Sequence, residues 1–286
     1  MKQAVMIIVI VLLFAATVIL AFNLLEDITR LVESNLPGIQ TELSKKIFAP
    51  PPIKSLAEHP DSYLTKEGVL SFTNIQRQNN NIPSLKENAV LDLMALAKVE
   101  DMFANQYFAH QSPSGKGVGD LAEDFSYQFI IVGENLALGG FKDDEALVTA
   151  WMESPGHREN ILNKAYQEIG IAVKKGVFEG KEVWLAVQHF GLSSGACPTI
   201  DQRLKISIDG KETQISLLKQ ELSALESEIK EARKKGYDRE EYGEKIGEYN
   251  ILVGRYNDLI NENKSLINIY NIQVNIFNNC VSGFLQ

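Results

Sequence analysis

The pattern of apolar and polar positions divides this chain of 286 residues into four regions. An uncharged, mostly apolar run comes first, and a polar stretch that contains prolines follows it. Mixed helix-like and strand-like patterns come next, and alternating three- and four-residue spacings then extend to the C-terminus. These patterns are typical of a membrane or signal segment, a linker, a globular domain and a coiled coil. We place the regions at residues 1–22, 23–62, 63–195 and 196–286.

The first region predicts an exported chain. Residues 4–22 are 19 residues without a charge, close to the roughly 20 that a membrane-spanning helix needs. Lys2 precedes this run, and Glu26 and Asp27 follow it, so the rest of the chain is expected outside the cytoplasm. A cleaved signal peptide is the alternative, although residues 19–21 make a poor cleavage site. We therefore expect a single-pass cell-membrane protein, or a secreted one if the segment is cleaved.

The second region is expected to be a juxtamembrane stalk and a linker. Residues 23–46 have apolar residues at helix-like spacing, interrupted at Pro37. The run Ala49–Pro52 contains three prolines and favours an extended polyproline conformation. We predict that this run is a solvated, semi-rigid spacer.

The third region predicts helices followed by an antiparallel pair of strands. Helices are expected after Thr65, at about 87–106 and at 143–151, and strands at 169–173 and 183–190. Helices that precede such a pair favour an α+β domain with helical layers on a sheet, rather than alternating βαβ units.

The fourth region predicts an antiparallel helical hairpin. Apolar residues alternate spacings of three and four from Ile215 to Ile229 and again from Tyr242 to Phe277, which is typical of a coiled coil. A break between these two runs supplies the turn. Tyrosines and Asn263 lie in the seam, so it either forms a two-helix core or opens to a partner, and self-association through the hairpin is one expectation.

Helix lengths predict a disulfide bond. At about 1.5 Å per residue, helices over 211–234 and 239–278 would be roughly 36 Å and 60 Å long. The second helix would overshoot the first by roughly 24 Å and bring Cys280 back to the segment that contains Cys197. An exported chain permits a bond between them, and two free thiols are the alternative.

Composition and motif chemistry exclude several functions. The net charge is −9 and the pI is about 5.1, so we expect no nucleic-acid partner. The chain has no H-E-x-x-H motif. Residues 191–195 match G-x-S-x-G, but Pro198 disfavours the helix that a serine nucleophile elbow must enter.

The histidines of the third region are the candidate chemical groups. His110, His157 and His189 all fall in it, and Glu134 lies between the first two. Two imidazoles and a carboxylate can bind zinc with positions left open for water, or can form a buried hydrogen-bonded network. His189 is expected to face the rim of a cleft from its strand.

Several motifs in this region carry a family resemblance. Residues 107–115 contain His110, residues 133–137 read Gly-Glu-Asn-Leu-Ala, and residues 151–162 contain Ser-Pro-Gly-His-Arg-Glu-Asn. In this order and spacing they resemble the CAP superfamily of cysteine-rich secretory, antigen 5 and pathogenesis-related proteins, also called SCP-like, especially its bacterial branch. Phe72–Arg77 resembles the family's first-helix signature, and Gln188–Gly191 resembles its closing strand.

The resemblance covers about residues 63–192 and implies a three-layer α–β–α sandwich with a central cleft. Carried over, His110 and His157 correspond to the paired cleft histidines, and Glu134 corresponds to the first acid. The same three residues are the tentative metal ligands, since the family's cleft can bind divalent metal, commonly zinc.

Two further side chains are weaker candidates for the cleft. Glu153 is nearest to the position of a second acid, but its register relative to Trp151 differs from that of animal members. A solvated helix end is the alternative for Glu153. Gln188 is expected to hydrogen-bond inside the cleft.

The family resemblance implies that more than one class of ligand can bind. Some members bind sterols or other lipids, and no single enzymatic activity unites them. We expect a membrane-anchored, extracytoplasmic binding module whose cleft takes a small, lipid-like or envelope ligand and optionally a divalent metal, with no catalytic residue assigned. The alternatives are a metal-assisted hydrolase of an envelope substrate, or a coiled-coil scaffold with the CAP domain as its head group.

Overall fold

A computed structural model describes residue 38, residues 45–235 and residues 239–285. These residues fall into two compact units. The sandwich unit holds residues 45–199 together with the described residues from 277 onward, and the hairpin unit holds residue 38 and the described residues of 200–276. The apolar run at 4–22 lies outside the described residues. Among the helices that are described, none has the length and apolar character needed to cross a bilayer.

One mixed sheet of six strands forms the middle layer of the sandwich unit. The strands are β1 (Lys46–Phe48), β2 (Ile53–Ser55), β3 (Lys86–Glu87), β4 (Phe129–Gly139), β5 (Glu168–Phe178) and β6 (Lys181–Ser193). Their order is β1-β4-β6-β5-β3, with β2 also on β4. The pairs β4–β6 and β5–β6 are antiparallel, and the three short strands pair parallel with their neighbours.

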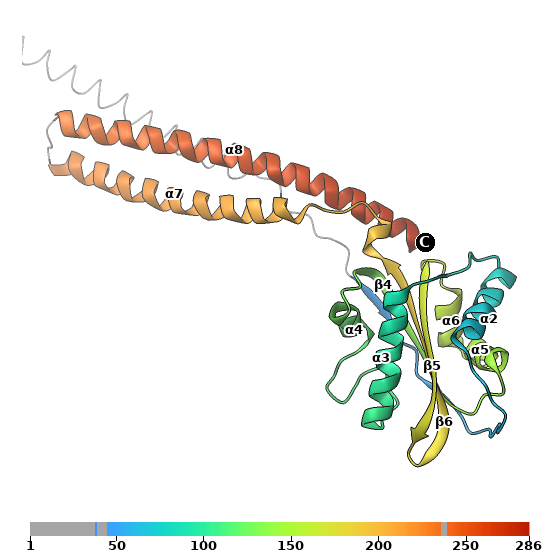
Figure 1. Ribbon diagram of the computed structural model, residues 1–286. Coiled ribbons are helices and arrows are strands. Elements are labelled where there is room, and N and C mark those ends of the chain that lie inside the picture. The colour runs from blue at the N-terminus through green and yellow to red at the C-terminus, as the bar shows by residue number, and fades with distance from the viewer. Residues whose placement is uncertain (1–37, 39–44, 236–238, 286) are drawn as a thin grey trace, which may run out of the picture. The chain divides into compact units, whose positions relative to one another are not determined.

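Helices cover both faces of this sheet, which makes the predicted α–β–α sandwich (Figure 1). One face carries α2 (Lys66–Asn79), α5 (Asp144–Glu153) and α6 (Pro155–Leu162), and the other carries α3 (Ala89–Asn105) and α4 (Val118–Asp124). Successive residues of β4 alternate between the two cores: Ile131 and Ala137 pack in the first, and Val132 and Leu136 in the second.

Local capping chemistry starts the helices where the sequence predicts. Thr65 caps α2 by accepting a hydrogen bond from the Gly68 amide at 3.0 Å. Asp143 caps α5 through the Ala146 amide at 2.9 Å. Pro155 follows the end of α5 and is also the first residue of α6. Proline is tolerated in the first turn of a helix, so it can end one helix and begin the next. The helix α6 was not predicted from the sequence.

The proline-rich linker is where the structure differs most from expectation. Instead of a solvated spacer, the chain on either side of Ala49–Pro52 forms β1 and β2 on the outer edge of β4. An uncovered edge strand leaves backbone N–H and C=O groups without partners, and β1 and β2 supply those partners along β4. β4 itself was not predicted, because it is buried on both faces and lacks the apolar–polar alternation of a half-buried strand.

The hairpin unit consists of α7 (Gln202–Lys235) and most of α8 (Arg239–Phe284). Both helices are longer than predicted, and α7 begins at Gln202 rather than near residue 211. The earlier start lets Ile208 pack with Ile267, Tyr270 and Val274. Ion pairs Lys211–Glu262 and Lys245–Glu228 connect the two helices in antiparallel register. Coiled-coil packing of the hairpin stays a prediction.

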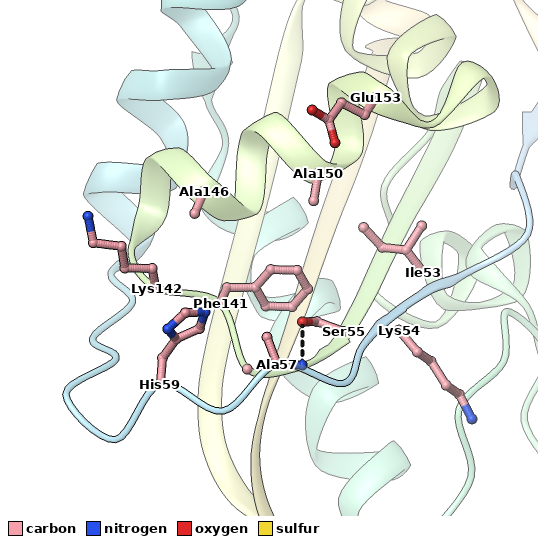
Figure 2. A pocket seen from close by; sticks show the side chains of 11 residues that line it. Ile53, Lys54, Ser55, Ala57, His59, Phe141, Lys142, Ala146, Ala150 and Glu153 are labelled. Atoms are coloured by element: carbon pink, nitrogen blue, oxygen red, sulfur yellow. Dashed lines mark hydrogen bonds between the residues drawn. The ribbon is translucent and has the colours of Figure 1, made fainter.

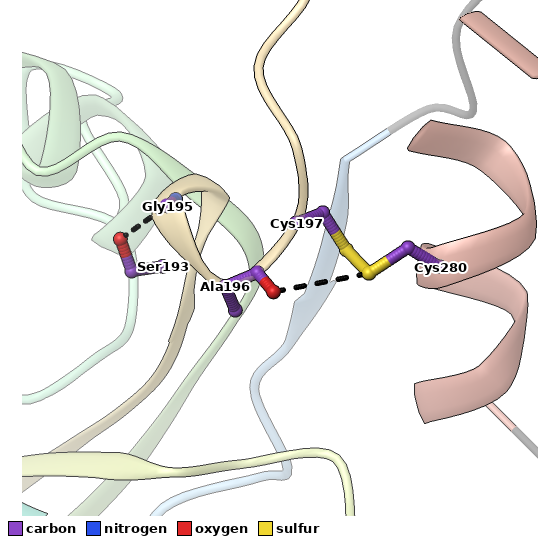
Figure 3. The surroundings of a disulfide bond; sticks show 5 residues. All are labelled: Ser193, Gly195, Ala196, Cys197 and Cys280. Atoms are coloured by element: carbon purple, nitrogen blue, oxygen red, sulfur yellow. Dashed lines mark hydrogen bonds between the residues drawn. A yellow bond between two sulfur atoms is a disulfide. The ribbon is translucent and has the colours of Figure 1, made fainter. Parts of the chain in front are cut away.

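Cys197 and Cys280 are joined by a disulfide bond, with their Cα atoms 5.8 Å apart (Figure 3). Both residues belong to the sandwich unit. Cys197 and Val281 are buried in its larger core, and Phe277 and Phe284 pack against the same core. The end of α8 is therefore a structural part of the sandwich unit.

Candidate functional site

A fully buried carboxylate lies at the centre of the candidate site. Glu134 in β4 is directly opposite His189 in β6, so both side chains lie on the same face of the sheet. Glu134 Oε2 is 2.8 Å from His189 Nε2, and Glu134 Oε1 is 2.6 Å from His110 Nδ1. Glu134 and His189 have no exposed side-chain surface, whereas His110 is 16% exposed. His110 is thus the member of this triad that reaches the surface.

The loop after α3 positions His110. Lys98 donates a hydrogen bond to the His110 carbonyl oxygen at 2.7 Å and another to the Tyr107 hydroxyl at 3.2 Å. Burial lowers the pKa of Lys98, against the opposing effects of Glu134 and Asp101. The ammonium therefore ties the loop to α3 from inside the domain.

The hydrogen-bond partners define the charges of the triad. Burial would raise the pKa of Glu134, but hydrogen bonds from His110 and His189 lower it to about 2, so the carboxylate is ionised. His110 Nε2 contacts the carbonyl oxygen of Pro50. Both partners of the His110 ring are hydrogen-bond acceptors, so both of its nitrogens are placed to donate.

His157 lies near this triad and is uncharged. It is fully buried in α6, and its Nδ1 lies 2.8 Å from the Ser154 hydroxyl. Burial, and then the charge of His110, lower the pKa of His157 to about 4. Its Nε2 is buried and has no hydrogen-bond partner among the described residues.

Gln188 lies on the opposite face of the sheet from Glu134. It donates to the Thr73 hydroxyl at 2.7 Å and accepts from the Asn135 side chain at 3.2 Å. Asn160 in turn donates to the Asn135 side-chain oxygen at 3.0 Å. The amide network links β4, β6, α2 and α6, and Gln188 does not join the histidine triad.

Glu153 also lies away from the triad. It is exposed at the end of α5 and lines a separate cavity of about 330 Å³ (Figure 2). His59, Ile53 and Phe141 line the same cavity. The structure therefore brings His110 and Glu134 into contact with His157 close by, and leaves Glu153 and Gln188 elsewhere.

The side chains as arranged do not fit a metal ion. Within the described ranges, no three His, Cys, Asp or Glu side chains gather in a way that could hold one. His110 has no free lone pair when both nitrogens donate, and both Glu134 oxygens accept from imidazoles. Among the described residues of the site, the ring nitrogens left without a partner are His157 Nε2 and His189 Nδ1.

Several residues of the site were missed from the sequence. His189 was expected at a cleft rim, yet it is fully buried against Glu134. His189 alternates with Val187, which predicts that both side chains lie on one face of the strand. The neighbouring strand β4 was not predicted, so Glu134 could not be placed opposite His189. Lys98 and Pro50 had no sequence signal, since one lies mid-helix and the other in an apparent linker.

Comparisons with known proteins agree on the domain type. Residues 70–190 match the model of the cysteine-rich secretory protein family, CAP. The uncharacterized Bacillus subtilis protein YkwD is 38% identical over 116 residues, which are 41% of this chain and 43% of that relative. The uncharacterized Bacillus subtilis membrane protein YlbC is 31% identical over 39% of this chain and 32% of its own length. The chain thus spans less than half the length of either relative.

Two solved structures are similar over less than half of the chain. An extracellular protein containing an SCP domain from Bacillus anthracis is 30% identical, with a TM-score of 0.38 over 44% of this chain and 39% of that one. An outer surface protein of Borrelia burgdorferi is 23% identical, with a TM-score of 0.40 over 45% of this chain and 95% of that one. The family match, the sandwich that contains it and the bacterial relatives identify residues 70–190 as a CAP domain that is similar to those of bacterial proteins.

Proposed function

We propose that the chain is an extracytoplasmic binding module whose cleft binds a hydrogen-bond acceptor of its ligand through His110. One observation carries this proposal: His110 Nε2 already meets a carbonyl oxygen, that of Pro50. The ionised Glu134 behind the ring contacts its Nδ1 and fixes its orientation. A charge-assisted donor of this kind favours carbonyl or carboxylate oxygens.

The proposed binding function also includes lipid-like ligands. Such a ligand needs an apolar cavity, and one of about 470 Å³ lies beside α3. Leu93, Leu96 and Ile171 line it, with Lys66 and Asp92 as its charged residues. Apolar ligands would use this cavity, whereas acceptor groups would use His110.

A metal-assisted hydrolase has less support. Hydrolysis needs a free base or a metal-bound water, and Glu134 is ionised but uses both oxygens to hold imidazoles. Saturable binding of zinc chloride in a calorimetric titration, lost in His110→Ala/His157→Ala, would overturn our preference for the binding module.

We also propose that the body of the chain lies outside the cytoplasm, anchored through residues 4–22. The names of one curated relative, a membrane protein, and of one solved relative, an extracellular protein, support this location. The Cys197–Cys280 disulfide supports it independently, because such bonds persist in oxidising compartments.

The binding proposal is tested with small fragments on the full chain. Ligand-observed NMR would screen fragments that carry primary amides or carboxylates against wild type, His110→Ala and His59→Ala. We expect saturable hits that disappear in His110→Ala and persist in His59→Ala, since His59 lies in the separate cavity. Hits that are equally strong in all three proteins would contradict the proposal.

A further inference from the structure

The segment that contacts His110 runs along β4 as a peptide ligand would. We call residues 46–55 the strap. The strap pairs parallel with β4 at both ends, through β1 and β2. Between them, the four residues 49–52 lie opposite only three residues of β4, 134–136, so the strap bulges at Glu134. Prolines have no N–H for the ladder, and here the carbonyl of Pro50 turns to His110 instead.

Side chains of the domain hold the strap at further points. The Asn160 side chain donates to the Phe48 carbonyl oxygen at 3.4 Å. Gly156 lets Pro50 approach α6 closely, because a Cβ at Gly156 would lie 2.6 Å from the Pro50 Cβ. These two contacts and His110 are placed to recognise an extended backbone that carries proline.

Basic residues flank this backbone contact. Lys45 lies 3.8 Å from Glu123 and 4.8 Å from the Phe129 ring centroid. Lys54 lies 5.6 Å from the centroid of the Phe108 ring. The groove therefore offers an acidic and an aromatic partner to a cation before the proline run, and an aromatic partner to a cation after it.

The strap is held by its backbone more than by buried side chains. No residue of the strap is buried, and Ile47 is 54% exposed. Only Phe48 and Ile53 pack partly against the larger core, whereas every residue of β4 is buried. Release of the strap would uncover the β4 edge and leave both cores of the sandwich in place.

We propose that the outer edge of β4, with His110, Asn160 and Gly156, is a binding groove for a separate extended polypeptide with prolines between basic flanks. The strap is its resident, competing occupant. The incoming chain would add as a parallel strand, the mode known as β-augmentation. This inference rests on the proposed binding function and names the ligand class.

The test uses full-length protein and a fluorescein-labelled peptide of residues 45–56. Phe48→Ala/Ile53→Ala removes the partly buried anchors of the strap, and Lys46→Ala/Leu56→Ala is the matched control at exposed positions. By fluorescence anisotropy, the anchor variant should bind the peptide at least about tenfold more tightly than the control does. Equal binding, or no saturable binding by an anchor variant with a wild-type circular dichroism spectrum, would overturn the proposal.

A second substitution tests whether the peptide occupies the same groove. Gly156→Ala added to the anchor variant should weaken peptide binding about tenfold, because its methyl group would clash with the proline. Gly254→Ala, where nothing lies within 4 Å, should have no effect. Dimers of the anchor variant that the peptide dissociates would overturn the proposal in favour of strap exchange between two copies.

Hydrogen exchange on the wild-type chain keeps the proposal testable if the anchor variant fails to fold. Amides of the strap should exchange at least about tenfold faster than those of β6. Equal protection would show that the strap is an integral strand and would overturn the proposal. If fragments bind at His110 while the peptide does not bind, the binding function stands and the peptide class fails.

Discussion

At the residue scale, the site depends on one buried charge and its two imidazole partners. Glu134 would be costly to bury alone, and His110 and His189 compensate it by donating to both oxygens. The sequence predicts Glu134 and His110 as candidates, because both lie in recognisable motifs. It does not predict the second acceptor at the His110 ring, because that acceptor is the carbonyl of Pro50, a residue 60 positions away.

Removal of the Glu134 charge should destabilise the domain strongly. Glu134→Gln would leave His110 and His189 without their carboxylate acceptor, and breaking a buried pair in this way costs about 3–5 kcal/mol. Urea unfolding of the variant would measure the loss. Glu153→Gln, at an exposed position, is the matched control and should change the free energy of unfolding by less than about 0.5 kcal/mol. Similar values for both variants would contradict the account.

His157 should make stability depend on pH. Its pKa is about 4 in the folded chain against an ordinary 6.5, so the folded state favours the neutral ring. The resulting stability is fully present above pH 6.5 and is lost as the pH falls through 4. The loss should approach roughly 3 kcal/mol. As the pH is lowered from 6.5 to 4, the free energy of unfolding should fall for wild type and change less for His157→Gln. Parallel curves for the two proteins would refute this role.

At the element scale, the helices whose residues carry a local signal are the elements that the sequence predicts. Thr65 and Asp143 satisfy amides of the first turn, so the starts of α2 and α5 are predicted closely, and apolar spacing predicts α3. Asn88 also caps α3, which was not predicted. β4 and the strap escape prediction for a shared physical reason. The first is buried on both faces and the second is ordered only by pairing with it, so neither has a local pattern of its own.

Loss of the α2 cap should have a measurable cost. Thr65 accepts from the Gly68 amide and donates to Asp144 at 2.9 Å, which ties α2 to α5. Thr65→Ala should lower the free energy of unfolding by about 1–2 kcal/mol. Thr213→Ala, at an exposed mid-helix position, should cost less than about 0.5 kcal/mol in the same denaturant titration. A negligible effect at Thr65 would mean that the cap is not needed.

At the scale of the whole molecule, the disulfide bond was predicted from the expected export of the chain and from the lengths of its two C-terminal helices. The sequence predicts the pairing of Cys197 with Cys280 because two helices of unequal length return the chain to its starting point. It underestimates both helices, since α7 begins earlier to cover Ile208 and α8 continues to pack Val281. The same return makes the last residues of the chain part of the sandwich unit.

The disulfide should contribute substantially to stability. It closes a loop with a sequence separation of 83 residues and thereby restricts the unfolded chain. Cys197→Ser/Cys280→Ser should lower the free energy of unfolding by about 2–5 kcal/mol. Thermal unfolding of this variant and of wild type, with and without reductant, measures the effect. Reductant should destabilise wild type alone, and equal sensitivity of both proteins would contradict this role.

The proposed binding function needs His110 to donate a hydrogen bond to an acceptor oxygen while Glu134 occupies its other nitrogen. Nitrogen-15 NMR of the imidazole nitrogens of the full chain at neutral pH tests it most directly, with His110→Ala to assign the signals. Both nitrogens of His110 should carry a proton, while His157 should be a neutral ring. A neutral His110 with one unprotonated nitrogen would contradict the charge assignment and the acceptor-binding function that rests on it.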